Sequence, residues 1–212
     1  MARMRFYMTP GSCSTGIHIL LEELDEVFEV TVVNLPKGDH FRPDYVALNP
    51  KSTIPTLVRR DGTVLTEVLA IAIWLARSHP RAGLWPAGAE AEARALEIMS
   101  HVTATVHGQG FARIFATSAF CADPAGHPAV QAKEREIVAK GFAWIEGLLP
   151  EDGFALGAFS AVDPILFYVA FWARKTDVPL PPRIAAHFRR MLARPAVVRV
   201  LKEEGYNPAI LA

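Results

Sequence analysis

The chain has 212 residues, 51% of them hydrophobic and 21% charged, a composition that excludes an intrinsically disordered protein and allows a sizeable buried core. Its 22 basic residues balance its 22 acidic ones, so there is no net positive field to make nucleic acid the main partner. Its apolar stretches fall short of the roughly 20 residues that a membrane-spanning helix needs, which argues against a membrane location.

The first 78 residues mix strand and helix patterns. Residues 4–8 indicate a strand, a Thr-Pro-Gly turn follows, and apolar residues between 17 and 24 recur at the spacing of one helical face. Residues 28–35 are rich in valine and indicate a second strand. Strand, helix and strand in this order predict a βαβ unit with two parallel strands.

A hairpin and a buried helix complete this part of the chain. Residues 56–60 and 63–65 flank Asp61-Gly62, which favours a two-residue turn between antiparallel strands. Residues 67–78 are almost all apolar and predict a helix buried on most sides. The predicted order is therefore β-α-β, a loop, and β-β-α.

Strand patterns end at a segment rich in proline and glycine. We interpret residues 79–89 as a linker between a first domain, residues 1–78, and a second, residues 90–212. The second domain is predicted to be all-helical. Its helical patterns cover residues 90–120, 127–149, 160–175 and 182–192, with a short helix after Pro195.

The two cysteines, Cys13 and Cys121, lie far apart, and the chain opens without the pattern of a secretion signal. This usage argues against a disulfide framework, and we expect a cytoplasmic protein.

Cys13 falls where the first predicted strand has ended and the first helix begins, with Ser12 and Ser14 as candidate helix caps. Unpaired backbone N–H groups and the positive end of the helix dipole stabilise a thiolate at such a position. A pKa two units below the usual value of about 8.5 would ionise roughly three quarters of the thiol at pH 7, against about 3%. The alternative is a small side chain packed beneath the first turn.

Two further residues of interest flank the predicted hairpin: Glu67 follows it and Pro55 precedes it. Glu67 precedes an apolar helix, where a carboxylate is favoured by the helix dipole. With the free N–H groups there, it could also bind a ligand that carries both an amine and a carboxylate. Pro55 opens the third predicted strand, and base rates favour a trans bond before it.

Together these motifs resemble the cytosolic glutathione transferases, most closely the bacterial beta class. The resemblance rests on YMTPGSCS at residues 7–14, NPK at 49–51 with IPTL at 54–57, and LTE at 65–67 leading into AIA at 70–72. It implies a thioredoxin-like α/β domain followed by an all-helical domain. It also implies that Pro55 is cis and that the Ile54 backbone pairs with glutathione. Glu67 and Val68 would hold the γ-glutamyl end, and Cys13 and His107 would reach the glutathione sulfur.

Several positions depart from the family pattern. Val68 replaces a small or hydroxylated residue and so removes a side-chain hydrogen bond. Lys37 is an approximate counterpart of a lysine expected after the second strand, and Ser100 stands where the beta class tends to have an asparagine that reaches the neighbouring subunit. Ser160 and Asp163 have the spacing of a helix capping box.

The predicted function is conjugation of glutathione, the co-substrate, with hydrophobic electrophiles, or thiol exchange, in a homodimer that serves detoxification. Phe111, Phe115 and Phe120 would line the electrophile pocket or merely fill the interdomain core. Ser12 or Ser14 could replace Cys13 as the group that contacts the sulfur.

Two other functions remain open. One is a glutathione-binding or thiol-sensing module with little turnover, and the other is a glutathione-dependent lyase, isomerase or dehalogenase on the same scaffold. We expect no metal cofactor, because His101 and His107 lie about 240° apart around a helix and cannot share a ligand face.

Overall fold

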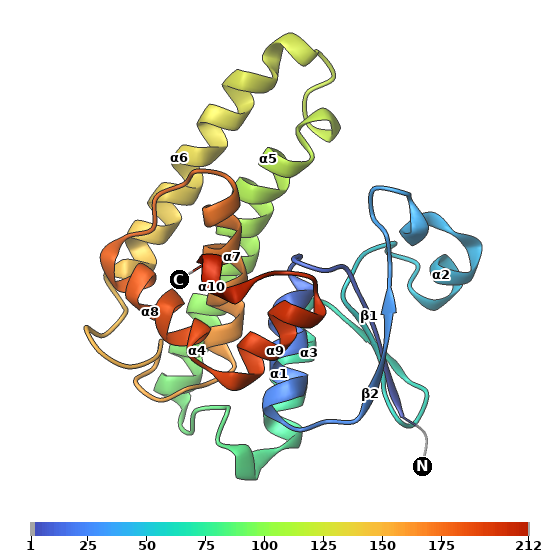
Figure 1. Cartoon of the computed structure of the whole chain (residues 1–212), viewed down its shortest axis with the longest axis vertical. Helices are drawn as coiled ribbons and strands as arrows, with labels where there is room; N and C mark the ends of the chain where they lie inside the picture. The colour runs from blue at the N-terminus through green and yellow to red at the C-terminus, as the bar shows by residue number, and fades with distance from the viewer. Residues whose placement is uncertain (1–2, 212) are drawn as a thin grey trace. The chain divides into compact units, whose positions relative to one another are not determined.

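The computed structural model describes residues 3–211, which form two compact units (Figure 1). One unit runs to Trp85 and includes the chain from Leu192 onwards, and the other is Pro86–Met191. The predicted division instead assigns the last twenty or so residues to the helical domain. These residues join the first unit because helix α9 (Pro195–Glu203) packs against α1 (Ser14–Glu23), and Arg194 forms a two-pronged ion pair with Glu23 at 2.6 and 2.7 Å.

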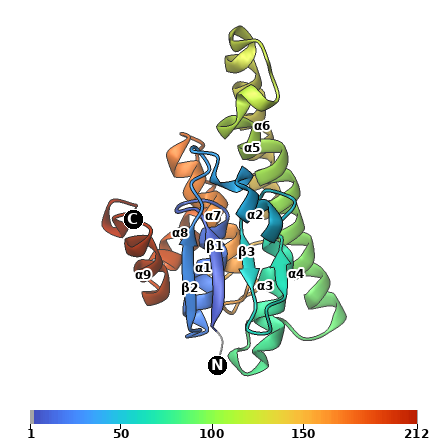
Figure 2. The same ribbon diagram turned by 90° about the vertical axis from the view of Figure 1, so that its right-hand side faces the viewer.

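The first unit is built on a four-stranded mixed sheet in the order β2-β1-β3-β4, of which Figure 2 shows β2, β1 and β3 side by side. The parallel pair β1–β2 confirms the predicted βαβ unit, with Met4 opposite Phe28, and β3 and β4 form the predicted hairpin. The bounds are β1 Met4–Met8, β2 Phe28–Val32, β3 Thr56–Val58 and β4 Val64–Thr66.

Helices cover both faces of this sheet. Helix α1 and helix α3 (Val68–Ser78) pack together on one side, and α2 (Pro43–Leu48) lies on the other (Figure 1). This is the thioredoxin-like arrangement that the resemblance implies. The core between them consists of fully buried apolar side chains, among them Phe6, Ile17, Leu20, Leu57 and Ile71. Helix α2 escapes prediction because it has six residues and buries only Tyr45, too little for a periodic pattern. The last element within the described residues is α10 (Pro208–Leu211).

The hairpin turn differs from the predicted two-residue turn. The register pairs Val58 with Val64, and Arg59 N–H donates to the Thr63 carbonyl, so three residues form the loop. Asp61 accepts hydrogen bonds from the backbone and hydroxyl of Thr63, which holds Asp61 away from positive φ. Gly62 alone takes a positive φ, of 83°, as the bulge of a three-residue hairpin requires.

The second unit is helical, with α7 at its centre. Every residue of this helix from Val162 to Ala173 is buried. The predicted helix over residues 90–120 is divided into three segments and ends at Phe115, where Ala116 leaves helical geometry. The elements are α4 (Ala89–His101), the π-helical segment η3 (Val102–Phe111), α5 (Ala112–Phe115), α6 (His127–Glu146), α7 (Val162–Lys175) and α8 (Pro182–Leu192). Short 3₁₀ turns lie at Asp39–Phe41, Pro80–Ala82, Thr117–Ala119 and Pro124–Gly126.

Asp163 and Ser160 form one half of the predicted capping box at the start of α7: the Asp163 carboxylate accepts the Ser160 N–H, whereas the Ser160 hydroxyl accepts the N–H of Val162 instead of that of Asp163. The Asp163 carboxylate accepts the N–H groups of Ser160 and Ala155, both at 2.7 Å, and contacts Nε2 of His187 at 2.8 Å. Asp163 is completely buried, so this cluster ties α7 to α8 and to the preceding turn. Within residues 3–211, none of the helices combines the length and the apolar character that a membrane span requires.

Candidate functional site

Cys13 lies at the N-cap of α1 and is only 6% exposed. Its Sγ points to the carbonyl oxygen of Ile54 at 3.7 Å, the distance of a weak S–H···O hydrogen bond. Burial raises the pKa of the Cys13 thiol to about 12. Backbone hydrogen-bond donors offset only part of this rise, and the negative charge of Glu67 adds to it. Of the two alternatives for Cys13, this structure favours the thiol packed beneath the first turn, because desolvation outweighs the helix N-terminus.

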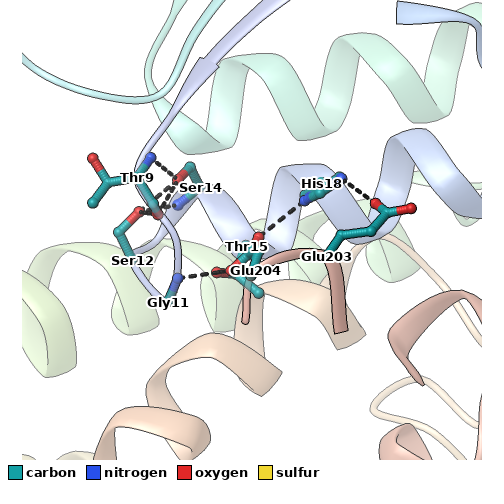
Figure 3. A network of polar contacts seen from close by, with 8 residues as sticks. All are labelled: Thr9, Gly11, Ser12, Ser14, Thr15, His18, Glu203 and Glu204. Atoms are coloured by element: carbon teal, nitrogen blue, oxygen red, sulfur yellow. Dashed lines mark hydrogen bonds and ion pairs between the residues drawn. The ribbon is translucent and has the colours of Figure 1, made fainter. Parts of the chain in front are cut away.

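Ser12 and Ser14 are engaged within the turn. Both hydroxyls lie within 3.0 Å of the Thr9 carbonyl oxygen, and they also contact each other (Figure 3). The two hydroxyl groups carry two hydrogens between them. One serine therefore donates its hydrogen to the other serine, and the second serine donates to the Thr9 carbonyl oxygen. In this arrangement both hydrogens are used inside the turn, and neither is left to donate to a sulfur.

Glu204, which the sequence analysis missed, holds this turn from the end of α9. Its carboxylate, 1% exposed, accepts the Gly11 N–H and the Thr15 hydroxyl, both at 2.7 Å, and contacts Nδ1 of His18 at 3.0 Å (Figure 3). Gly11 has a φ of 69°, which glycine adopts without strain. The conformation of the Cys13 turn is thus fixed by a residue 193 positions further along the chain. No local sequence pattern could reveal this pairing.

The loop before β3 is also framed by buried polar groups. Tyr45 Oη and Asn49 Nδ2 both donate to the Thr53 carbonyl, at 2.6 and 2.9 Å, and Asn49 also donates to the Thr56 hydroxyl. These hydrogen bonds fix the residues on either side of the Ile54–Pro55 peptide bond. That bond is cis, as the resemblance implies.

Glu67 ends the hairpin with a φ of 72° and serves as the N-cap of α3, whose first residue is the buried Val68. Its side chain is 64% exposed and pairs with the Lys51 ammonium, with Nζ 2.6 Å from Oε1. Lys51 belongs to the NPK motif but was not predicted as a site residue. The carboxylate at this helix terminus therefore binds an amine cation in this structure. Lys37 is exposed in the turn after β2.

The other predicted site residues lie in the helical unit. His107 on η3 has Nδ1 at 3.2 Å from the Tyr168 hydroxyl, and its ring edge packs on Trp172 at a centroid distance of 4.8 Å. Burial lowers the pKa of His107 to about 4, so the ring is neutral at pH 7. Tyr168 and Trp172 were not predicted.

The three predicted pocket phenylalanines do not form one cluster. Phe111 and Phe115 stack at 5.9 Å and both meet the Trp172 ring edge-on. Phe111 is completely buried, whereas Phe115 is 53% exposed. Phe120 instead lies beneath the Arg113 guanidinium, 5.3 Å from its ring centroid. Ser100 is exposed on α4.

Comparisons with known proteins place these features in context. Two family models match the chain: "Glutathione S-transferase, N-terminal domain" over residues 11–78 and "Glutathione S-transferase, C-terminal domain" over residues 128–190. Glutathione S-transferase GstA of Escherichia coli O157:H7 is 32% identical, over 95% of this chain and 99% of that protein.

Solved structures are similar over almost the whole chain. A glutathione transferase homologue from Sulfitobacter with bound glutathione has a TM-score of 0.89 and 30% identity, covering 98% of this chain and 100% of that one. A beta-class enzyme from Sphingomonas chungbukensis has a TM-score of 0.81 and 27% identity, covering 96% and 100%. A maleyl pyruvate isomerase, described as a zeta-class bacterial glutathione S-transferase, has a TM-score of 0.79 and 26% identity, covering 92% and 95%.

Proposed function

The chain belongs to the glutathione S-transferase family, and from this we propose that it joins glutathione to hydrophobic electrophiles. The observation that carries the proposal is the position of the Cys13 Sγ, 3.7 Å from the Ile54 carbonyl and next to cis Pro55. We propose that the cysteinyl part of glutathione pairs with the backbone of Ile54, which brings the glutathione sulfur beside the Cys13 thiol.

The γ-glutamyl end would bind at the start of α3. The Glu67 carboxylate already accepts the Lys51 ammonium at 2.6 Å, so it fits the ammonium group of glutathione at the same place. The backbone N–H of Val68 and the α3 N-terminus suit the adjoining carboxylate. Lys51, once displaced, supplies a cation for a carboxylate of the ligand.

We propose that Cys13 acts as a neutral thiol that positions the glutathione sulfur. A protonated thiol can donate its S–H to a thiolate, and burial keeps Cys13 protonated. Glutathione gives up its thiol proton to solvent; its thiolate attacks the electrophile, a carbon–sulfur bond forms, and the leaving group departs with its electron pair. This argues against thiol exchange through Cys13, since that exchange would need Cys13 itself as a thiolate.

The helical unit offers an apolar surface for the second substrate. The half-exposed ring of Phe115 lies edge-on to Trp172, with a centroid distance of 5.3 Å, and the neutral His107 contacts the same tryptophan. We propose that this aromatic cluster binds the hydrophobic electrophile and that Phe111 supports it from the core. Phe120, paired with Arg113, takes no part.

A second candidate is a glutathione-dependent isomerase, because a zeta-class isomerase shares this fold at 26% identity. In this chain, isomerisation by addition of the glutathione thiolate to a conjugated double bond, followed by its release, would also need no Cys13 thiolate. A binding module with little turnover is the third, favoured by Val68, which offers no side-chain hydrogen bond beside Glu67.

Three assays on the purified chain separate these functions: retention on immobilised glutathione, turnover of a chloronitroaromatic or a glutathione mixed disulfide, and isomerisation of a maleyl substrate. We expect retention and conjugation, with retention lost in Glu67→Gln and kept in Glu29→Gln, an exposed carboxylate on β2. Turnover of the disulfide alone, abolished by Cys13→Ala, would refute the neutral-thiol role. Retention without turnover of any substrate would identify a binding module.

We also propose that the protein is a cytoplasmic homodimer that detoxifies electrophiles, as the resemblance implies. Light scattering coupled to size-exclusion chromatography tests the oligomeric state. A mass near twice that of the chain supports the dimer, and a monomer contradicts it.

A further inference from the structure

A cluster of one histidine and two carboxylates joins α1 to α9 away from Cys13. His18 and Glu22 are four residues apart on α1, so their side chains lie on the same helical face, and Glu203 reaches them from α9 (Figure 3 shows His18 and Glu203). One ligand atom from each of the three lies within 4.8 Å of the others.

The free edge of the His18 ring points into this cluster. His18 is 3% exposed, and within residues 3–211 its Nε2 has no hydrogen-bond partner. Nε2 lies 3.3 Å from Oε2 of Glu203, but without the alignment of a hydrogen bond. A buried nitrogen of this kind is costly unless something occupies its lone pair or takes its proton.

The opposite edge of the His18 ring contacts a carboxylate, as is common for histidines that bind a metal. Nδ1 lies 3.0 Å from Oε1 of Glu204, a carboxylate that only accepts hydrogen bonds, so Nδ1 carries the hydrogen. Such a carboxylate partner orients the ring of a metal-ligating histidine and makes its other nitrogen more basic. In a neutral ring this arrangement puts the lone pair on Nε2, the nitrogen that lies 3.3 Å from Oε2 of Glu203.

The local charge also favours a cation. Glu22, Glu203 and Glu204 bring three carboxylates together, and Arg199 neutralises one of them by binding Oε2 of Glu22 at 2.6 Å. With a neutral His18 the cluster retains an excess of two negative charges, which one divalent ion would balance.

We propose that His18 Nε2, Glu22 and Glu203 bind a zinc ion, with water as the fourth ligand. Ligand atoms at 2.0–2.2 Å from a tetrahedral zinc lie roughly 3.3–3.6 Å apart, which matches the 3.3 Å between Nε2 and Glu203. Nitrogen and oxygen donors in a three-residue set suit zinc and leave one open position. The ion would link α9 to α1. Because Glu204 at the end of α9 holds the Cys13 turn, the ion would also stabilise that turn. This zinc site takes no part in the proposed transferase reaction.

The test uses the full chain without an affinity tag, treated with a chelator and then titrated with Co²⁺ followed by Zn²⁺. We expect one equivalent of Co²⁺ to give visible absorption bands without a thiolate-to-cobalt charge-transfer band, and Zn²⁺ to displace it. Zn²⁺ should also raise the melting temperature. Glu203→Gln, at a side chain that is 51% exposed, should keep the fold and weaken binding at least about tenfold.

Glu29→Gln is the matched control and should bind as the wild type does. Glu22→Gln gives a second ligand variant, also weakened at least about tenfold. The proposal is overturned by the absence of binding, by unchanged binding in both ligand variants, or by a charge-transfer band that indicates cysteine. A nuclear magnetic resonance spectrum that shows both His18 nitrogens protonated in the presence of Zn²⁺ would also overturn it, since an imidazolium held by two carboxylates would then explain the cluster.

Discussion

The Cys13 thiol should react far more slowly than an ordinary cysteine. With its pKa raised to about 12, about one thiol in 10⁵ is ionised at pH 7, against about 3% for a model cysteine. The thiolate fraction is thus lower by a factor of roughly 3,000. A more basic thiolate is a better nucleophile, and with a Brønsted coefficient of about 0.45 this recovers roughly 40-fold. The net expectation is a rate at pH 7 about 100-fold below that of a cysteine in an unstructured peptide, whose pKa is about 8.5.

The assay measures the second-order rate with dithiodipyridine from pH 6 to 10, in a Cys121→Ser background so that Cys13 is the one thiol present. We expect the rate to rise throughout this range without a plateau. Glu67→Gln should accelerate the reaction, because the Glu67 charge helps to raise the pKa, whereas Glu29→Gln should not. A plateau near pH 7, or a rate equal to that of the model thiol, would refute the argument. It would mean that the helix N-terminus outweighs burial.

Three further predictions concern stability. Asp163→Ala leaves two buried N–H groups and His187 without their acceptor, and the free energy of unfolding in urea should fall by about 3–5 kcal/mol. The fully exposed Asp152→Ala is its control, and an equal loss there would contradict the reasoning. Glu204→Ala should cost about 2–4 kcal/mol in the same measurement and also speed Cys13 modification, because the turn loses its buried acceptor. His107 has a native pKa of about 4 against 6.5, so the unfolded chain takes up a proton first as the pH falls. The free energy of unfolding is therefore unaffected by this histidine above pH 6.5. It falls by up to about 3 kcal/mol as the pH drops towards 4. Urea curves in this window should lose that dependence in His107→Gln, and a flat wild-type profile would count against it.

Much of the first unit follows from short-range patterns. The strand over residues 4–8 and the helix that begins beside Cys13 were predicted because alternation and helical periodicity are properties of neighbouring residues. The parallel pairing of β1 and β2 followed from the connection between them. The cis bond before Pro55 was implied by the family resemblance, against the base rate for such bonds.

Local patterns failed where a distant partner decides the outcome. The turn at Asp61-Gly62 was predicted one residue too short, because the dipeptide alone does not show that Thr63 occupies the Asp61 carboxylate. Lys51 was not identified as the partner of Glu67, since 16 residues separate them.

The sequence by itself determined the two-part architecture, the positions of most helices and strands, and the candidate residues from Cys13 to Glu67. Only the tertiary structure decided the state of those residues. Burial, and hence the pKa of Cys13, depends on every element packed around the thiol, and the acceptor for Gly11 comes from Glu204, 193 positions away. Composition and periodicity carry information about neighbours along the chain, whereas desolvation and buried hydrogen bonds depend on neighbours in space.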